Sequence, residues 1–123
     1  MLNKLKIVER LILLPSEMKE IELEIFTLTN QLNTLQKEYE GLELKEMGYI
    51  NSVLTPDGKK VYPNAESRQA ALQERLIENV NYHKKVVESD TIKHNLELEK
   101  IDFNEKRREF SMMKTLAEMN MEE

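Results

Sequence analysis

Two histidines and the carboxylates near them are the residues of this chain that could bind a metal ion. His83 and His94 are its only histidines, and Asp90 and Glu97 lie four residues before and three residues after His94. On a helix these spacings place side chains on one face, where imidazole and carboxylate could bind zinc. No further ligand motif is present, so we interpret the histidines as polar residues that interrupt a coiled-coil seam and fix its register. We predict no metal and no cofactor.

Nucleophilic catalysis has no recognisable set of residues in this sequence. Serine, threonine and carboxylate side chains are plentiful, but no motif pairs a nucleophile with a base. No glycine-rich loop could bind a phosphate group. We therefore predict that the protein is not an enzyme and has no catalytic residues.

A basic run at residues 106–108, Lys-Arg-Arg, lies between Phe103 and Phe110. Aromatic and basic side chains together can bind single-stranded nucleic acid. Consecutive helical residues point in different directions, however, and Glu105 and Glu109 lie among them. The net charge of −5 also argues against nucleic-acid binding by the chain as a whole. We interpret the run as a solvated helix face with salt bridges and keep nucleic-acid binding as an alternative.

Composition indicates long solvated helices within at most one domain. The chain has 123 residues, of which 33% are charged and 6% aromatic, with three glycines, three prolines and no cysteine. The absence of cysteine permits a reducing compartment. The uninterrupted apolar run over residues 11–14 is too short for a signal-peptide core or a membrane span. We expect a cytoplasmic protein without membrane contact.

The segment 48–63 predicts a β-hairpin between two helical segments. Pro56, Asp57 and Gly58 favour a tight turn. The residues before and after this turn are prone to form strands: Tyr49, Ile50, Val53, Leu54, Val61 and Tyr62. The hairpin is also the net-positive part of the chain. We predict that its outward side chains contact a partner: Tyr49, Val53, Lys59, Lys60 and Tyr62.

Residues 16–47 predict the first long helix. Its apolar residues alternate at spacings of three and four, the heptad pattern of a coiled coil: Met18, Ile21, Ile25, Leu28, Leu32, Leu35, Tyr39 and Leu42. Pro15 favours a helix start at this point. Residues 1–14 predict a short N-terminal helix, and the pattern leaves open whether it continues the first helix or folds back.

Residues 64–120 predict a second, longer helix with Asn64 as its N-cap. It carries two apolar stripes on nearly opposite sides. The broader one contains Leu72, Leu76, Val80, His83, Val87, His94, Leu98, Ile101, Met112, Leu116 and Met119. The second one contains Ile92, Leu96, Phe103 and Phe110. Because the first helix is too short to cover both stripes, we predict that the second stripe is an oligomer interface.

The fold class predicted from these patterns is all-α. It is a long antiparallel helical hairpin, a coiled coil, with a small β-hairpin at the bend, and residues 1–123 form a single domain.

This order of elements resembles the β-type subunit of prefoldin. In that family, hairpins assemble into a barrel, and the coiled coils hold unfolded clients. The resemblance implies a holdase chaperone as an alternative function.

The segment 55–72, Thr-Pro-Asp-Gly-Lys-Lys-Val-Tyr-Pro-Asn-Ala-Glu-Ser-Arg-Gln-Ala-Ala-Leu, resembles small uncharacterised helical-hairpin proteins of bacteriophages and prophages in Gram-positive bacteria. Its shared features are a turn, a Lys-x-Tyr-x-Asn element and an Ala/Glu/Arg helix start. This resemblance implies an accessory protein encoded near recombination or single-strand-binding functions. We expect a non-enzymatic homo-oligomer that also binds another protein and assists DNA replication or recombination.

Overall fold

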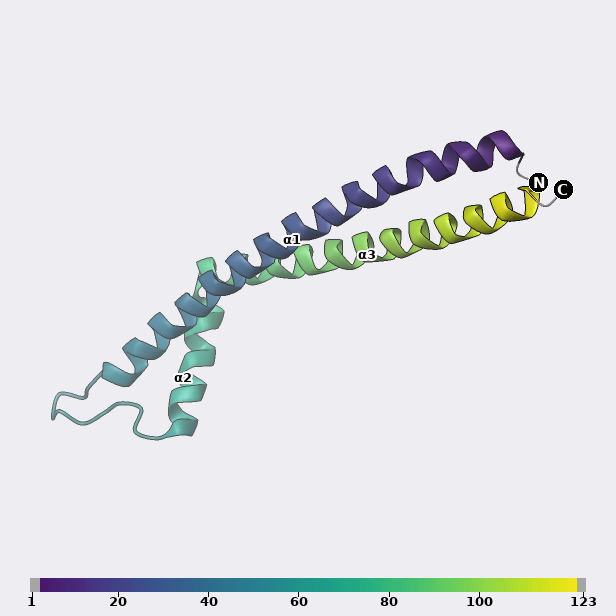
Figure 1. Cartoon of the computed structure of the whole chain (residues 1–123). Helices are drawn as coiled ribbons and strands as arrows, with labels where there is room; N and C mark the ends of the chain where they lie inside the picture. Colours follow the sequence, from purple (N-terminus) through teal and green to yellow (C-terminus); the bar gives the residue numbers. More distant parts are fainter. Residues whose placement is uncertain (1–2, 122–123) are drawn as a thin grey trace. The chain divides into compact units, whose positions relative to one another are not determined.

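The computed structural model describes residues 3–121, which form three helices. These are α1 (Lys4–Ser52), α2 (Ala65–Glu78) and α3 (Val80–Met121) (Figure 1). The described part of the chain is therefore all-α, in agreement with the predicted class.

The predicted β-hairpin at residues 48–63 is wrong. Tyr49 and Ile50 belong to the last turns of α1, and Ile50 is only 1% exposed. Between α1 and α2, pairing is limited to an isolated bridge between Leu54 and Lys60. The predicted turn does form, since Gly58 has a φ of 83° and its N–H donates to the carbonyl of Thr55 (2.9 Å). Burial of Ile50 keeps the first strand helical, and the remaining residues are too few for an independent two-stranded ribbon.

Helix α1 passes through Pro15 without ending. Proline lacks the N–H that would bond the carbonyl of Leu11, and it disfavours a helical conformation in the residue before it. That preceding residue, Leu14, is completely buried, while Pro15 itself is exposed. Burial of Leu14 and of Ile7, one heptad earlier, thus offsets the cost of the proline. Residues 1–14 continue the first helix as far as the structure describes them, from Lys4 onward.

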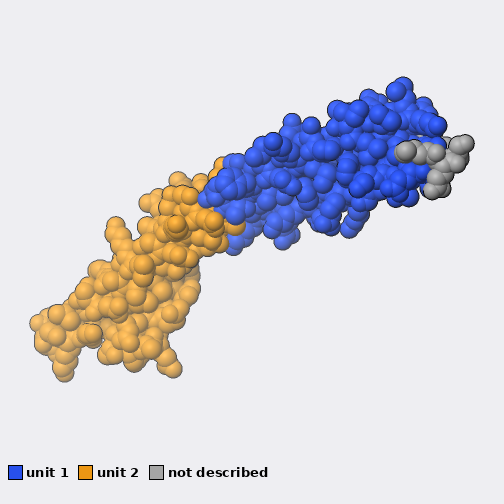
Figure 2. Space-filling view, viewed as in Figure 1, with its two compact units in different colours: residues 1–30, 93–123 blue, residues 31–92 orange. Residues whose placement is uncertain are grey.

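The chain divides into two compact units (Figure 2). In unit 1, residues 1–30 and 93–123, the early part of α1 packs antiparallel to the later part of α3. Its core is the buried cluster of Ile7, Leu14 and Met113, with further apolar side chains packed around it. These are Leu11, Phe110, Leu116 and Ala117. The buried residues Ile7, Leu14, Ile21 and Leu28 recur every seventh position, so the heptad pattern begins eleven residues before the predicted Met18.

Unit 2, residues 31–92, combines the end of α1, all of α2 and the start of α3. Asn64 caps α2 as predicted: its Oδ1 accepts from the backbone N–H of Ser67 (2.8 Å), and its own N–H donates to the Ser67 hydroxyl (3.3 Å). Such a reciprocal pair is a capping box. Ile50, Ala71 and Leu76 are the buried apolar residues here.

The predicted second helix is interrupted at Asn79. This residue has an extended backbone (φ −81°, ψ 102°), and its Oδ1 accepts from the backbone N–H of Tyr82 (3.0 Å). One asparagine therefore ends α2 and caps α3, which needs neither proline nor glycine.

Replacing Pro15 with alanine should stabilise the protein by roughly 1–3 kcal/mol, because it restores a helical hydrogen bond and removes a steric clash. The measurement is urea unfolding followed by circular dichroism at fixed protein concentration. Ser16→Ala, an exposed neighbour, should change the stability by less than about 0.5 kcal/mol. A destabilised Pro15→Ala variant would contradict the unbroken helix.

Gly41 and Gly58 should respond oppositely to replacement by alanine. A Cβ at either position meets no neighbouring atom, but Gly41 lies within α1 whereas Gly58 has a positive φ. We expect Gly41→Ala to stabilise by about 1 kcal/mol and Gly58→Ala to destabilise by a similar amount. Thermal unfolding of both variants tests this, and equal effects would contradict the assigned loop conformation.

Candidate protein-interaction surfaces

The outward side of α3 in unit 1 carries an exposed apolar stripe, here called the α3 outer stripe. Its apolar members are about half exposed: Leu98 51%, Ile101 55%, Met112 52% and Met119 58%. Its remaining positions are exposed polar residues: His94, Glu105, Arg108 and Thr115. Spacings of four and three residues alternate along it from His94 to Met119. This is a second heptad pattern on a helix whose other side already packs against α1.

Glu105 and Arg108 lie near the middle of the α3 outer stripe. Within residues 3–121, neither forms an ion pair with another part of the chain; the four ion pairs found there involve other side chains. The chain therefore presents one acidic and one basic group without an ion-pair partner in the middle of the α3 outer stripe.

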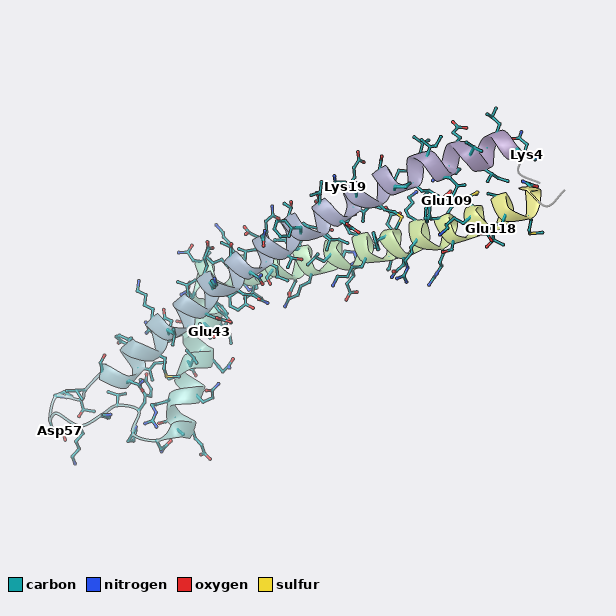
Figure 3. The ribbon with its side chains drawn as sticks, in the orientation of Figure 1. Lys4, Lys19, Glu43, Asp57, Glu109 and Glu118 are labelled. Atoms are coloured by element: carbon teal, nitrogen blue, oxygen red, sulfur yellow. The ribbon has the colours of Figure 1, made fainter. Side chains whose placement is uncertain are left out.

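Helix α1 also has an exposed apolar side in unit 1. Its members share the three-and-four spacing, with a gap around Lys19, which Figure 3 labels. They are Leu5, Val8, Ile12, Leu23 and Phe26. Phe26 is 64% exposed, which leaves a large apolar area in contact with solvent.

The four residues predicted to form the oligomer interface are buried or half-buried within the chain. Leu96 is 7% exposed, and Phe110 packs against the cluster of Ile7, Leu14 and Met113. Ile92 and Phe103 are half-buried, the first in unit 2 and the second in unit 1. The expectation that Phe110 lacks intramolecular cover is therefore wrong, because α1 continues through Pro15 and Phe110 packs against Ile7 and Leu14.

The five residues predicted to contact a partner surround the loop between α1 and α2. Lys59 and Lys60 are exposed, whereas Val53 and Tyr62 are half-buried. Tyr49 is 48% exposed, with the Arg75 guanidinium 4.0 Å from its ring centroid, a cation–π contact. Arg75 also forms an ion pair with Glu46. Asp57 marks the tip of this loop (Figure 3), where it accepts a hydrogen bond from the Thr55 hydroxyl, which lowers its pKa.

Both histidines are exposed on α3, so neither interrupts the seam between α1 and α3. His83 belongs to unit 2 and His94 to unit 1. In the described range 3–121, no three histidine, cysteine, aspartate or glutamate side chains come together as a metal site would require. A shallow groove in unit 2 contains His83 near Tyr82 and Glu43. The Tyr82 hydroxyl donates to Glu43 (2.7 Å), and this bond raises the pKa of Tyr82 to about 12, which opposes its ionisation.

An arginine bound by two carboxylates joins the helices of unit 1. Arg10 on α1 donates to Glu109 on α3 through Nε (2.7 Å) and one Nη (3.0 Å), and its guanidinium also contacts Glu17 (2.9 Å). Glu109 projects from α3 toward α1 (Figure 3). The Arg10 hydrogen bond lowers the pKa of Glu109, and the two glutamates raise the pKa of Arg10 above its usual value. This bidentate contact adds a directional polar interaction to the apolar seam between α1 and α3.

The apolar residues of the α3 outer stripe were predicted to lie on the broader, inward stripe, and they were therefore missed as a surface. The signal that could have identified the correct side is the continuation of the α1 heptads to Leu14 and Ile7. With α1 that long, one stripe of α3 is covered and the other is exposed.

Comparison with known proteins gives no relative, since no protein-family model, no curated protein and no solved structure matches this chain. Within residues 3–121, no helix is both long and apolar enough to cross a lipid bilayer.

Acid should weaken unit 1 through Glu109. Its pKa is lower folded than unfolded, so the Arg10 contact stabilises the fold above the unfolded pKa, near 4.5, and this contribution is lost as pH falls through the folded pKa. We expect Glu109→Gln to be less stable than the wild type at pH 7 and to lose less stability on acidification. Urea unfolding from pH 7 to pH 3 measures both. Glu118→Gln, an exposed change on the same helix, is the control and should follow the wild type.

Proposed function

We propose that this protein is a non-enzymatic coiled-coil protein that acts by association, with itself and with other proteins. The observation that carries the proposal is the second apolar side on each helix of unit 1. The inward sides of α1 and α3 pack against each other. On their outward sides, Leu98, Ile101 and Phe26 remain more than half exposed. Helices with apolar residues on two sides need two partners.

The exposed area of one chain supports this proposal. Its accessible surface is 9293 Å², whereas a folded monomer of 14.5 kDa exposes about 6,900 Å². The excess of about 2,400 Å² is comparable to what one partner loses in a large obligate interface. Association would bring the exposed area per chain close to that of ordinary folded proteins.

For the wider role, we propose an accessory factor of phage type in DNA replication or recombination. This part of the proposal depends on the resemblance of residues 55–72 to phage proteins. In the structure these residues form the turn at Gly58, the capping box at Asn64 and the start of α2. A turn and cap of this kind hold the Lys-x-Tyr-x-Asn element in a defined conformation.

The two alternative functions receive less support from particular observations. A prefoldin-type chaperone would need strands for its barrel, and residues 53–64 form only one isolated bridge. Binding of single-stranded nucleic acid would need Phe103 and Phe110 beside the basic run. Phe110 instead packs into the core of unit 1, so it is not available for base stacking.

Sedimentation equilibrium tests the proposal. We expect a mass of at least about twice 14.5 kDa at tens of micromolar. Ile101→Glu, on the α3 outer stripe, should reduce this mass at unchanged helix content, because it places a charge in an apolar contact. Asn95→Glu adds the same charge at an exposed position of α3 beside the stripe and should leave the mass unchanged. A wild-type chain that stays monomeric at 100 µM would refute association with itself.

A further inference from the structure

We propose that the α3 outer stripe binds the same stripe of a second copy in antiparallel orientation, about a two-fold axis between Lys106 and Arg107. The inference rests on the proposed function and specifies its partner, orientation and register.

The spacing of the α3 outer stripe permits an antiparallel pair. From His94 to Met119, its successive intervals are 4, 3, 4, 3, 4, 3 and 4 residues, which read identically in both directions. A reversed copy can therefore place every position of the stripe opposite another position of the stripe. In this register Ile101 faces Met112, and the central layers contain Glu105 and Arg108. The stripe extends over about 38 Å at 1.5 Å per residue, which is sufficient for three heptads of knobs-into-holes packing.

The charges select this register and orientation. Glu105 of each copy faces Arg108 of the other, which gives two symmetric ion pairs where each chain has two unpaired groups. A shift of one heptad in either direction would place Glu105 and Arg108 opposite Ile101 and Leu98, respectively, or opposite Thr115 and Met112. A parallel pair in register would set Glu105 against Glu105 and Arg108 against Arg108. Like charges in contact oppose association, and unpaired charges against uncharged side chains lose hydration without an opposite charge to compensate.

Self-complementarity is also the reason to favour a second copy over a different protein. A two-fold interface requires that one surface match itself, with residue i on j and j on i. The stripe meets this condition in both its spacing and its charges. Another protein would have to reproduce the same reversed pattern.

Charge reversal with mixing tests the pairing. Glu105→Arg creates two arginine–arginine contacts per dimer, and Arg108→Glu creates two glutamate–glutamate contacts. Each variant alone should have a dimer dissociation constant at least about tenfold higher than the wild type. An equimolar mixture should recover dimers, because both pairs in the mixed dimer are then between opposite charges. Sedimentation velocity measures all four samples, and a mixture no tighter than the separate variants would overturn the register.

Cysteine cross-linking tests the orientation independently, since the chain has no cysteine of its own. An equimolar mixture of Ile101→Cys and Met112→Cys should form a disulfide between the two variants under mild oxidation. Neither variant alone should do so in the antiparallel dimer, because identical positions are about 16 Å apart along the helix axis, beyond the reach of a disulfide. Efficient cross-linking of Ile101→Cys alone would indicate a parallel pair and overturn the proposal.

The two levels of the proposal fail differently. A wild-type chain that is monomeric at every concentration refutes self-association and this dimer together. A wild-type oligomer that shows neither rescue on mixing nor the mixed disulfide refutes only this dimer.

Discussion

The unbroken passage of α1 through Pro15 is the constraint on which the rest of the structure depends. If α1 began at Ser16, the far end of α3 would have no helix beside it from the same chain. Because Ile7 and Leu14 extend the heptad pattern backward, α1 reaches Met113 and defines a continuous seam in unit 1. An interior proline costs about 3 kcal/mol, and complete burial of Leu14 beside it is the compensation that the structure shows. The choice of which α3 stripe faces inward follows from this seam.

Polar contacts fix the register of the paired helices, which the apolar seam alone does not determine. A heptad seam of leucine and isoleucine tolerates shifts by one heptad, whereas Arg10 can reach Glu109 only in one register. In unit 2, the Tyr82–Glu43 bond and the Lys85–Glu38 ion pair (2.5 Å) serve the same purpose. Ser89 is the exception, since its buried hydroxyl has no hydrogen-bond partner among the described residues.

Much of the fold could be predicted from the sequence, because heptads and caps are local patterns. The helix through Met18 and Leu42 and the cap at Asn64 required only spacing and residue type. The errors arose where tertiary contacts override local preference. Pro15 reads as a helix start, Ile50 as a strand residue, and Val80 as the middle of a helix. Burial of Leu14 and of Ile50 nevertheless keeps the first two residues within α1, and Asn79 ends one helix and caps the next. The surface was misassigned for the same reason, since a first helix that begins at Ser16 leaves Phe110 without a partner in its own chain.

Two independent effects favour the observed choice of stripe. The inward side of α3 carries Phe103 and Phe110, and phenylalanine buries more apolar area than the leucine, isoleucine and methionine of the outer stripe. The outer stripe carries Glu105 and Arg108, which would face apolar residues of α1 if the helix were rotated, and burial of unpaired charge is costly. Both effects place the aromatic stripe against α1. The charges that keep the outer stripe out of the seam become favourable only opposite a surface with the reversed order of charges, and a second copy in antiparallel orientation provides such a surface.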